Sequence, residues 1–193
     1  MNFSAVILAG GKSSRMGCDK AFLQMGGITL LARQIRLARE IGAADVFISG
    51  RPGTDYSSFG CRVLMDGILE AGPLAGIAQA MRVVRTPLLL VLAVDMANIQ
   101  REQLHYLHGQ CQSGMGVVPI AASVIEPLAA FYPQGAVPLA EQLLAEAEPS
   151  RTPGARAFAE LCVQKGLARF VAAPPAATTA FRSWNVPADV SIG

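Results

Sequence analysis

The sequence predicts one α/β domain in which helices cover both faces of a mostly parallel, twisted sheet. Short apolar segments alternate with amphipathic ones through the N-terminal half, a pattern typical of strand, helix and strand units joined by right-handed crossovers. Small aliphatic residues dominate the 52% apolar share, while aromatic residues make up 6% and charged residues 16%. Such residues suit buried parallel strands, and 193 residues suit a single hydrophobic core. Ligands are expected beyond the carboxyl ends of the strands.

Four strands and two helices are expected in the N-terminal half. The strands are short apolar segments, and the fourth, LLLVLAV, is the most apolar in the chain. They cover residues 3–8, 45–49, 62–65 and 88–94. A first helix should begin after Thr29, which can cap its N-terminus, and should end at Gly42. Its apolar residues lie near one face, and its arginines should face water. A second helix should begin at Pro73 and run to residue 84.

The C-terminal half has a less regular pattern. Asn98 is placed to cap a helix over residues 100–110. Two strands and two helices follow, and a proline-rich surface connection precedes the last apolar segment. The strands are expected over 116–120 and 128–132, the helices over 136–146 and 155–165, the connection over 172–179 and the last segment over 181–186. His105 and His108 lie three residues apart on the first helix, where packing or contact with water accounts for both.

Composition excludes several classes of function. A net charge of only +2 gives no field that would favour DNA, RNA or an anionic membrane as partner. The longest apolar stretch, residues 87–94, is far shorter than the ~18 residues that span a bilayer, and the first residues do not read as a secretory signal. The four cysteines form no C-x-x-C pair, which argues against a zinc or dithiol site. We therefore expect a cytoplasmic protein in a reducing compartment.

The segment from Leu8 to Lys20, LAGGKSSRMGCDK, carries the most chemical information. It follows a predicted strand, and its glycines allow backbone N–H groups to approach a ligand closely. Lys12, Arg15 and Lys20 supply positive charge against a single acid, Asp19. A polyphosphate would be bound by both the amides and the charge. Taken one at a time, Arg15 and Lys20 are better explained as ordinary surface charges, and Lys12 keeps that explanation.

Two familiar nucleotide-binding motifs do not describe this loop. A Walker loop requires G-x-x-x-x-G-K-[ST]; residues 11–13 supply its end, but Val6 stands where the first glycine belongs. A dinucleotide-binding loop requires G-x-G-x-x-G, whereas the glycines here lie at 10, 11 and 17. Neither a P-loop nor an NAD-type site is predicted.

The same segment resembles the signature L-A-G-G-x-S-x-R-M-G-x-D-K of the molybdenum cofactor guanylyltransferases and their nucleotidyltransferase relatives, and every fixed position is matched. Two further features resemble the family: GPLAG at residues 72–76, and Asp95 at the end of the most apolar strand. The likeness covers nearly the whole chain and is strongest over residues 3–95. It implies a three-layer α/β/α Rossmann-like fold of the nucleotide-diphospho-sugar transferase type. The single domain, residues 1–193, would have a nucleotide-binding half at about 1–98 and an acceptor-binding half at about 99–193.

The resemblance assigns roles to individual residues. In the family, an aspartate that ends a central strand coordinates Mg²⁺, and Asp95 has that place; a hard cation requires such a carboxylate. Leu8, Ala9 and Gly10 are assigned to guanine and ribose. The implied catalytic residues are Arg15, Lys20 and Asp95. The implied nucleotide- and cofactor-binding set is Leu8, Ala9, Gly10, Gly11, Lys20, Asp66, Pro73, Leu74, Gly76, Asp95 and Asn185. From the residues alone, Asp66 and Asp95 are equally well explained as turn or helix-start aspartates.

The closing segment FRSWNVPAD resembles the family's F-x-N-x-N-T-P-E-D. The residues it retains are Phe181, Asn185, Pro187 and Asp189. Ser183 replaces the first asparagine and Val186 replaces the threonine. In addition, Ala97 stands where the family usually has proline after the metal aspartate. These differences bear on the pterin side of the site more than on GTP binding.

The resemblance implies transfer of GMP from GTP to molybdenum-molybdopterin, with release of pyrophosphate and with Mg²⁺ as cofactor. Attack of a terminal phosphate on the α-phosphorus crowds negative charge, so catalysis needs positioning and neutralisation rather than a protein nucleophile. The expected partners are GTP and molybdenum-molybdopterin as substrates, with transient contacts to other cofactor-biosynthesis proteins or molybdoenzyme chaperones. No nucleic acid and no membrane is expected.

Two other hypotheses remain open at this stage. A cytidylyltransferase acting on the same pterin, or on a sugar or alcohol phosphate, has a related loop, although Leu8 and Gly10 favour guanine. A nucleotide-binding relative without turnover would suit the altered residues near the C-terminus. The intact Arg15, Lys20 and Asp95 argue against that reading.

Overall fold

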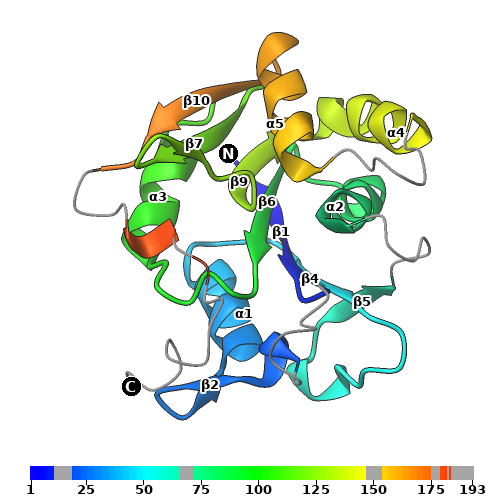
Figure 1. Cartoon of the computed structure of the whole chain (residues 1–193), viewed down its shortest axis with the longest axis vertical. Coiled ribbons are helices and arrows are strands. Elements are labelled where there is room, and N and C mark those ends of the chain that lie inside the picture. The colour runs from blue at the N-terminus through cyan, green and yellow to red at the C-terminus, as the bar shows by residue number, and fades with distance from the viewer. Residues whose placement is uncertain (11–18, 66–71, 147–153, 175–178, 182, 184–193) are drawn as a thin grey trace.

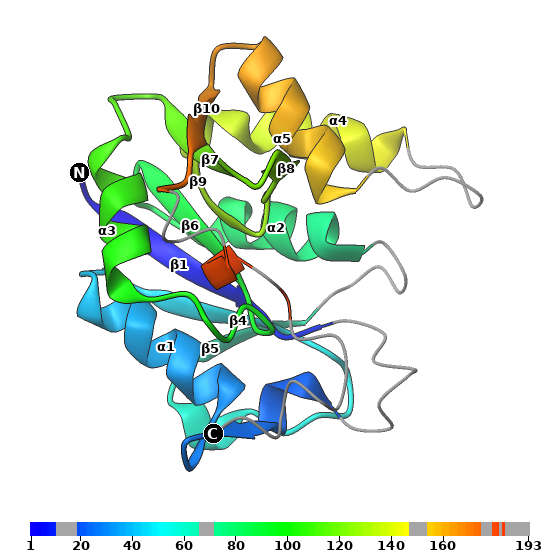
Figure 2. The ribbon, with the colours of Figure 1, turned by 60° about the vertical axis from the view of Figure 1, so that its left-hand side comes forward.

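A mixed β-sheet forms the middle layer of the molecule, and helices cover both of its faces (Figures 1 and 2). The computed structural model describes residues 1–10, 19–65, 72–146, 154–174, 179–181 and 183. Within them the main sheet has eight strands, seven of which follow the order β10-β7-β9-β6-β1-β4-β5, while β8 pairs with β7. The predicted three-layer α/β architecture with a mostly parallel sheet is therefore confirmed.

The parallel part of the sheet comes from the N-terminal half, as predicted. Its strands are β1 (Phe3–Leu8), β4 (Val46–Gly50), β5 (Arg62–Met65) and β6 (Leu88–Ala93). β1 pairs with β6 on one side, from Phe3 opposite Leu88 to Leu8 opposite Ala93, and with β4 on the other. Every residue of β1 and β6 is buried, because helices cover both faces of these central strands.

The other side of the sheet contains a reversed strand. β9 (Ala129–Pro133) runs antiparallel to both β6 and β7 (Gly116–Ala121), and β10 (Ala168–Ala172) runs parallel to β7. Sequence reasoning found the segments of β7 and β9. It did not find β10, the short β8 (Val124–Ile125), or the hairpin of β2 (Gln24–Met25) and β3 (Ile28–Thr29).

Two apolar clusters fill the spaces between the sheet and its helices. One cluster joins the sheet to α1 (Leu30–Glu40) and α3 (Arg101–Gly109). The other joins the opposite face to α2 (Gly72–Val83), α4 (Val137–Ala145) and α5 (Ala155–Gln164). Figure 2 shows α1 and α3 on one side of the strands and the other three helices on the opposite side. None of the described helices is long and apolar enough to cross a membrane.

Of two predicted N-terminal helix caps, one is confirmed and the other is wrong. Thr29 caps α1 as predicted, since its Oγ1 accepts a hydrogen bond from the Ala32 N–H at 3.2 Å. The predicted cap at Asn98 is wrong: Gln100 caps α3, in a reciprocal pair of hydrogen bonds with Gln103. Ile99 explains the difference, because it is fully buried in the apolar cluster and the helix begins only after it.

Candidate active site

The carboxyl ends of β1 and β6 meet at one edge of the sheet. The Val94 N–H donates to the Leu8 carbonyl at 3.1 Å, which joins the two strand ends. On the other side of β1, the Ala9 and Gly10 N–H groups both donate to the Ser49 carbonyl, at 2.9 and 3.2 Å. The backbone at the start of the glycine-bearing loop is therefore fixed by both neighbouring strands.

A cavity of about 260 Å³ lies at this edge. Its walls come from the ends of β1 and β6, from the turn around residues 19–20, from the start of α2 and from the segment before β9. The lining residues are Leu8, Ala9, Gly10, Asp19, Lys20, Pro73, Ala93, Val94, Asp95 and Leu128. Three larger hollows, of about 480, 490 and 360 Å³, lie against α1 and α3, at the amino ends of β4 and β5, and between α2 and α4. None of the three is lined by the strand ends of the carboxyl edge, where open α/β sheets bind ligands.

A cation and a carboxylate meet in this cavity. The Lys20 Nζ lies 2.9 Å from the Asp95 Oδ2, and the two side chains are 20% and 21% exposed. Lys20 opens a short 3₁₀ turn, Lys20–Phe22, and Asp19 caps that turn by accepting a hydrogen bond from the Ala21 N–H at 3.0 Å. Ala21 is fully buried, so the turn is anchored in the core. The turn thus brings Lys20 to a strand end 75 residues further along the chain.

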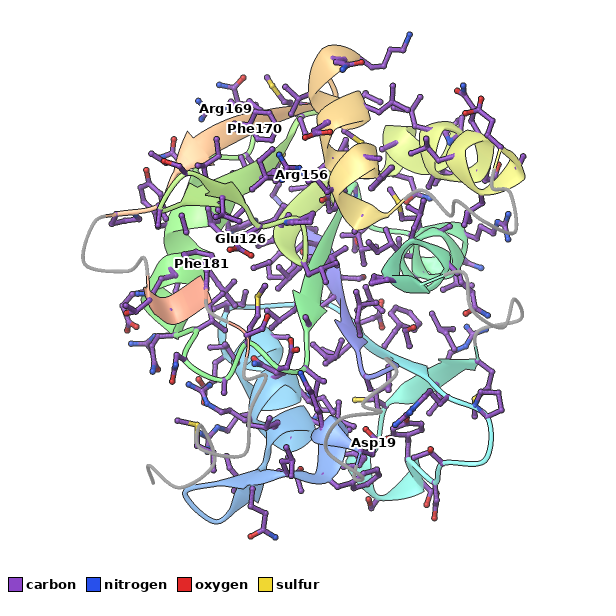
Figure 3. The ribbon with its side chains drawn as sticks, viewed as in Figure 1. Asp19, Glu126, Arg156, Arg169, Phe170 and Phe181 are labelled. Carbon is purple, nitrogen blue, oxygen red and sulfur yellow. The ribbon has the colours of Figure 1, made fainter. Side chains whose placement is uncertain are left out.

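A second ion pair supports the turn that carries Lys20. The Asp19 Oδ2 lies 2.6 Å from an Arg51 Nη2, and Figure 3 shows Asp19 beyond the carboxyl end of β1. Hydrogen bonding of the Arg51 guanidinium to Asp19 raises the pKa of that guanidinium. Arg51 is held in turn, because its backbone N–H donates to the Tyr56 hydroxyl at 3.2 Å. Sequence reasoning missed Arg51, which follows β4 and has no motif to mark it.

The start of α2 closes the cavity on the side of β4. Pro73 lines the cavity, whereas Leu74 and Gly76 are buried beneath it and are not among its lining residues. A Cβ on Gly76 would lie 2.3 Å from the Ser49 Oγ and 3.2 Å from the Leu8 Cδ2. Gly76 therefore allows α2 to pack closely on β1 and β4, directly behind the backbone that forms the cavity wall.

The structure brings together many, but not all, of the residues selected from the sequence. Those at the cavity are Leu8, Ala9, Gly10, Lys20, Pro73 and Asp95. The positions that lie outside the described residues are Gly11, Arg15, Asp66 and Asn185. Phe181 is buried in the cluster that contains α1 and α3. Leu128 was missed, because its place depends on the pairing of β9 with β6, where the Ala93 N–H donates to its carbonyl at 2.8 Å.

The donor set fits a divalent cation bound together with a phosphorylated ligand. Among the described residues there is no group of three or more His, Cys, Asp or Glu side chains that could hold a metal alone. The Asp95 carboxylate can supply a hard oxygen ligand. Its ion pair with Lys20 shows that a cation can lie next to it in the cavity. Mg²⁺ is commonly held by one or two carboxylates, substrate phosphates and water, which is the arrangement this site allows.

Solved structures with the same fold define the class. The chain superposes on molybdopterin-guanine dinucleotide biosynthesis protein A from Archaeoglobus fulgidus with a TM-score of 0.70 and 19% identity, over 97% of this chain and 94% of that one. It superposes equally well, at 0.70 and 21% identity, on 2-C-methyl-D-erythritol 4-phosphate cytidylyltransferase from Thermus thermophilus, over 98% and 96% of the two chains. The chain therefore has the fold that these two solved structures share.

The sequence comparison narrows this class to a family. The model of the MobA-like NTP transferase domain matches residues 5–165. A probable molybdenum cofactor guanylyltransferase from Opitutus terrae is 37% identical over 189 residues, which is 96% of this chain and 92% of that protein. The chain belongs to the family of MobA-like NTP transferase domains.

Proposed function

We propose that the protein transfers GMP from GTP to molybdenum-molybdopterin, forming the molybdopterin guanine dinucleotide and releasing pyrophosphate. The pairing of Lys20 with Asp95 at the carboxyl edge is the observation that carries the proposal, because it places a cation and a metal-binding carboxylate in one cavity. The 37% identity to a probable guanylyltransferase over nearly the full length of both chains supports the choice of substrates. The match to the family model supports nucleotidyl transfer.

The backbone at the end of β1 favours guanine over cytosine. The Ala9 and Gly10 N–H groups already donate hydrogen bonds to the Ser49 carbonyl. This segment therefore offers carbonyl acceptors, and not amide donors, to a nucleotide base. The pairing edge of guanine carries two adjacent donors, the ring N–H and the 2-amino group, whereas that of cytosine carries one donor and two acceptors. We assign guanine and ribose contacts to Leu8, Ala9 and Gly10 on this ground.

The transfer requires that charge be neutralised around the α-phosphorus. A terminal phosphate oxygen of the acceptor attacks this phosphorus, and the bond to the β-phosphate oxygen breaks to release pyrophosphate. Asp95 would hold Mg²⁺, which supplies charge neutralisation when bound. Lys20, 2.9 Å from Asp95, would contact the triphosphate at the same time. Arg15 is assigned a phosphate contact as well. Positioning and neutralisation account for the rate, and no protein nucleophile is needed.

Several finer assignments belong to the same proposal. Mg²⁺ is the proposed metal, and the cytoplasm is the proposed compartment. Within one domain, residues 1–98 are proposed to bind the nucleotide and residues 99–193 the acceptor. The residues that also keep their proposed binding roles are Gly11, Asp66, Leu74, Gly76 and Asn185. Other cofactor-biosynthesis proteins or molybdoenzyme chaperones are proposed as transient partners.

Nucleotide binding and turnover test the proposal directly. Calorimetric titration with GTP, CTP and ATP, with and without Mg²⁺, should show selective binding of GTP that Mg²⁺ strengthens. Preference for CTP would favour a cytidylyltransferase, and no binding of any nucleotide would favour a relative without turnover; either result would contradict the proposal. The binding data then justify a turnover assay with molybdenum-molybdopterin.

Replacing the metal-binding carboxylate should abolish most turnover. Asp95→Ala is expected to lower kcat by roughly 10²–10³-fold, the range seen when one electrostatic group is removed from an active site. Asp45→Ala is the matched control, because Asp45 is exposed and lies before β4 at the opposite edge of the sheet. If Asp95→Ala kept full turnover with unchanged Mg²⁺ dependence, the assignment of Asp95 would be wrong.

A further inference from the structure

The segment that follows Asp95 is an irregular but buried connection. We call residues 94–100 the β6–α3 connection, since it joins β6 to α3. Met96, Ala97 and Ile99 are at most 2% exposed. Its internal hydrogen bonds are two turn contacts, from the Met96 N–H to the Ala93 carbonyl at 3.3 Å and from the Ile99 N–H to the Met96 carbonyl at 3.2 Å. The position of Asp95 therefore depends on what holds this connection from outside.

Two adjacent side chains of α1 bind the connection. The Gln34 Nε2 donates to the Met96 carbonyl at 2.8 Å, and an Arg33 Nη2 donates to the Ile99 carbonyl at 3.0 Å. Gln34 is fully buried, and Arg33 is half-buried rather than turned to water as its place in the sequence suggested. The two accepting carbonyls belong to the residues one and four positions after Asp95.

Burying Gln34 has a cost that its bond to Met96 must offset. The Gln34 Oε1 accepts no hydrogen bond from any residue that the structure describes. A buried polar atom is unfavourable without a hydrogen-bond partner, so an apolar side chain would fill this place at lower cost. The Nε2 donor, aimed at the residue after Asp95, is the feature that glutamine adds.

We propose that Gln34, supported by Arg33, is a positioning residue that fixes Asp95 for metal binding with GTP. The inference rests on the proposed function, because the role of Asp95 is taken from it. Gln34 does not touch the nucleotide or the metal; it acts through the backbone of the β6–α3 connection. It is thus an outer support of the kind that orients metal ligands in other sites.

The test compares metal binding with stability in two variants of the same helix. Gln34→Met keeps the length of the side chain and removes its donor. Thr29→Ala removes the α1 cap, which lowers the stability of the helix, and leaves both contacts to the connection in place. Mn²⁺ affinity is measured by electron paramagnetic resonance in the presence of GTP, GTP affinity without metal by calorimetry, and stability by thermal unfolding.

Gln34→Met should weaken Mn²⁺ binding in the GTP complex by roughly 10–100-fold, the range found when a group that orients a metal ligand is lost. GTP affinity without metal should stay unchanged, and kcat should fall with little change in the KM for GTP. Thr29→Ala should lower the unfolding temperature without changing Mn²⁺ affinity. Equal Mn²⁺ affinities in Gln34→Met and the wild type, or equal losses in the two variants, would overturn the inference.

A second pair of variants covers the case in which Gln34→Met does not fold. Arg33→Met removes the bond to Ile99 from a half-buried position, and Arg36→Met is its control, since Arg36 is exposed and pairs with Glu40 on the same helix. Arg33→Met should weaken Mn²⁺ binding several-fold and Arg36→Met should not; equal effects would overturn the inference. A wild-type protein whose Mn²⁺ binding does not increase with GTP would instead contradict the proposed function itself.

Discussion

At the scale of single residues, the proposed metal ion would compete with Lys20 for the Asp95 carboxylate. The Lys20 ammonium lies 2.9 Å from it, and a divalent cation would need the same oxygens. Both side chains are about four-fifths buried, so the pair is shielded from water and salt more than a surface pair is. Lys20 holds the carboxylate in place, and in the proposed function it would also contribute charge for the phosphates.

Removing Lys20 should separate these two effects. Lys20→Met is expected to strengthen Mn²⁺ binding without nucleotide by about two- to fivefold, because breaking a partly exposed ion pair involves up to ~1 kcal/mol. Turnover should fall, because the charge near the phosphates is lost. Electron paramagnetic resonance of Mn²⁺ and a steady-state assay measure the two changes. Weaker Mn²⁺ binding in Lys20→Met would show that the two cations do not compete.

The sequence predicted several of the residues that come together, but not how they are held. Leu8 ends β1, and Asp95 lies two residues after the end of the parallel strand β6, so their meeting at one edge follows from the strand pattern. Gln34, Arg51 and Leu128 could not be found in this way. Each is placed by a contact between elements distant in sequence. In the sequence alone, a glutamine on a helix is typical of a surface residue, and only the packing of the helix shows that it is buried.

At the scale of elements, the long apolar segments were predicted well and the short strands were not. β1 and β6 are continuous apolar runs, which a buried parallel strand requires. β10 carries Arg169 as its second residue, and this side chain donates to the Gln110 carbonyl and to the Gln110 Oε1, at 2.8 and 3.0 Å. Because this charged residue packs against the end of α3, the segment lacks the apolar pattern from which a strand is predicted. β2, β3 and β8 have two residues each and show no periodicity.

The packing of α3 on the sheet should make stability depend on pH. The His108 ring lies 4.8 Å from that of Phe3 and 5.3 Å from that of Phe131, and its Nε2 is 2.9 Å from the Met1 carbonyl oxygen. Burial lowers the pKa of His108 below its ordinary 6.5. The unfolded chain then binds the proton more readily, so stability is full above about pH 6.5 and decreases as the pH falls towards the lowered value.

Urea unfolding at pH 7.5 and pH 5.5 measures this effect. The difference in midpoint should be smaller in His108→Gln than in the wild type. His105→Gln is the control, because His105 is an exposed histidine on the same helix. An unchanged difference in His108→Gln would assign the pH dependence to other groups.

At the scale of the whole molecule, one sheet joins the two halves of the chain. β6 and β9 share five residue pairs, from Leu88 opposite Pro133 to Leu92 opposite Ala129. α2 and α4, which also come from different halves, carry an ion pair between Arg82 and Glu141 at 2.8 Å. We therefore expect the two halves to unfold together.

Cys162 offers a probe of this cooperativity. It is fully buried in α5, and burial raises the pKa of its thiol to about 12. At pH 8 an alkylating reagent should reach it only after unfolding, because access and the thiolate are both lacking in the folded chain. The urea midpoint of Cys162 alkylation, read by mass spectrometry, should coincide with that of the loss of helical circular dichroism. Alkylation at lower urea would mean that the C-terminal half opens separately.

The reversed strand β9 also determines when one edge of β6 can be paired during synthesis of the chain. β6 has β1 on one edge, which is synthesised earlier, but its other edge waits for β9, whose last residue follows roughly forty positions later. At a synthesis rate of about 5–20 residues per second, that edge stays without its partner for about 2–8 s. An apolar strand with an open edge is prone to pair with other chains. The strand that ends two residues before Asp95 therefore needs protection from other chains until β9 is synthesised.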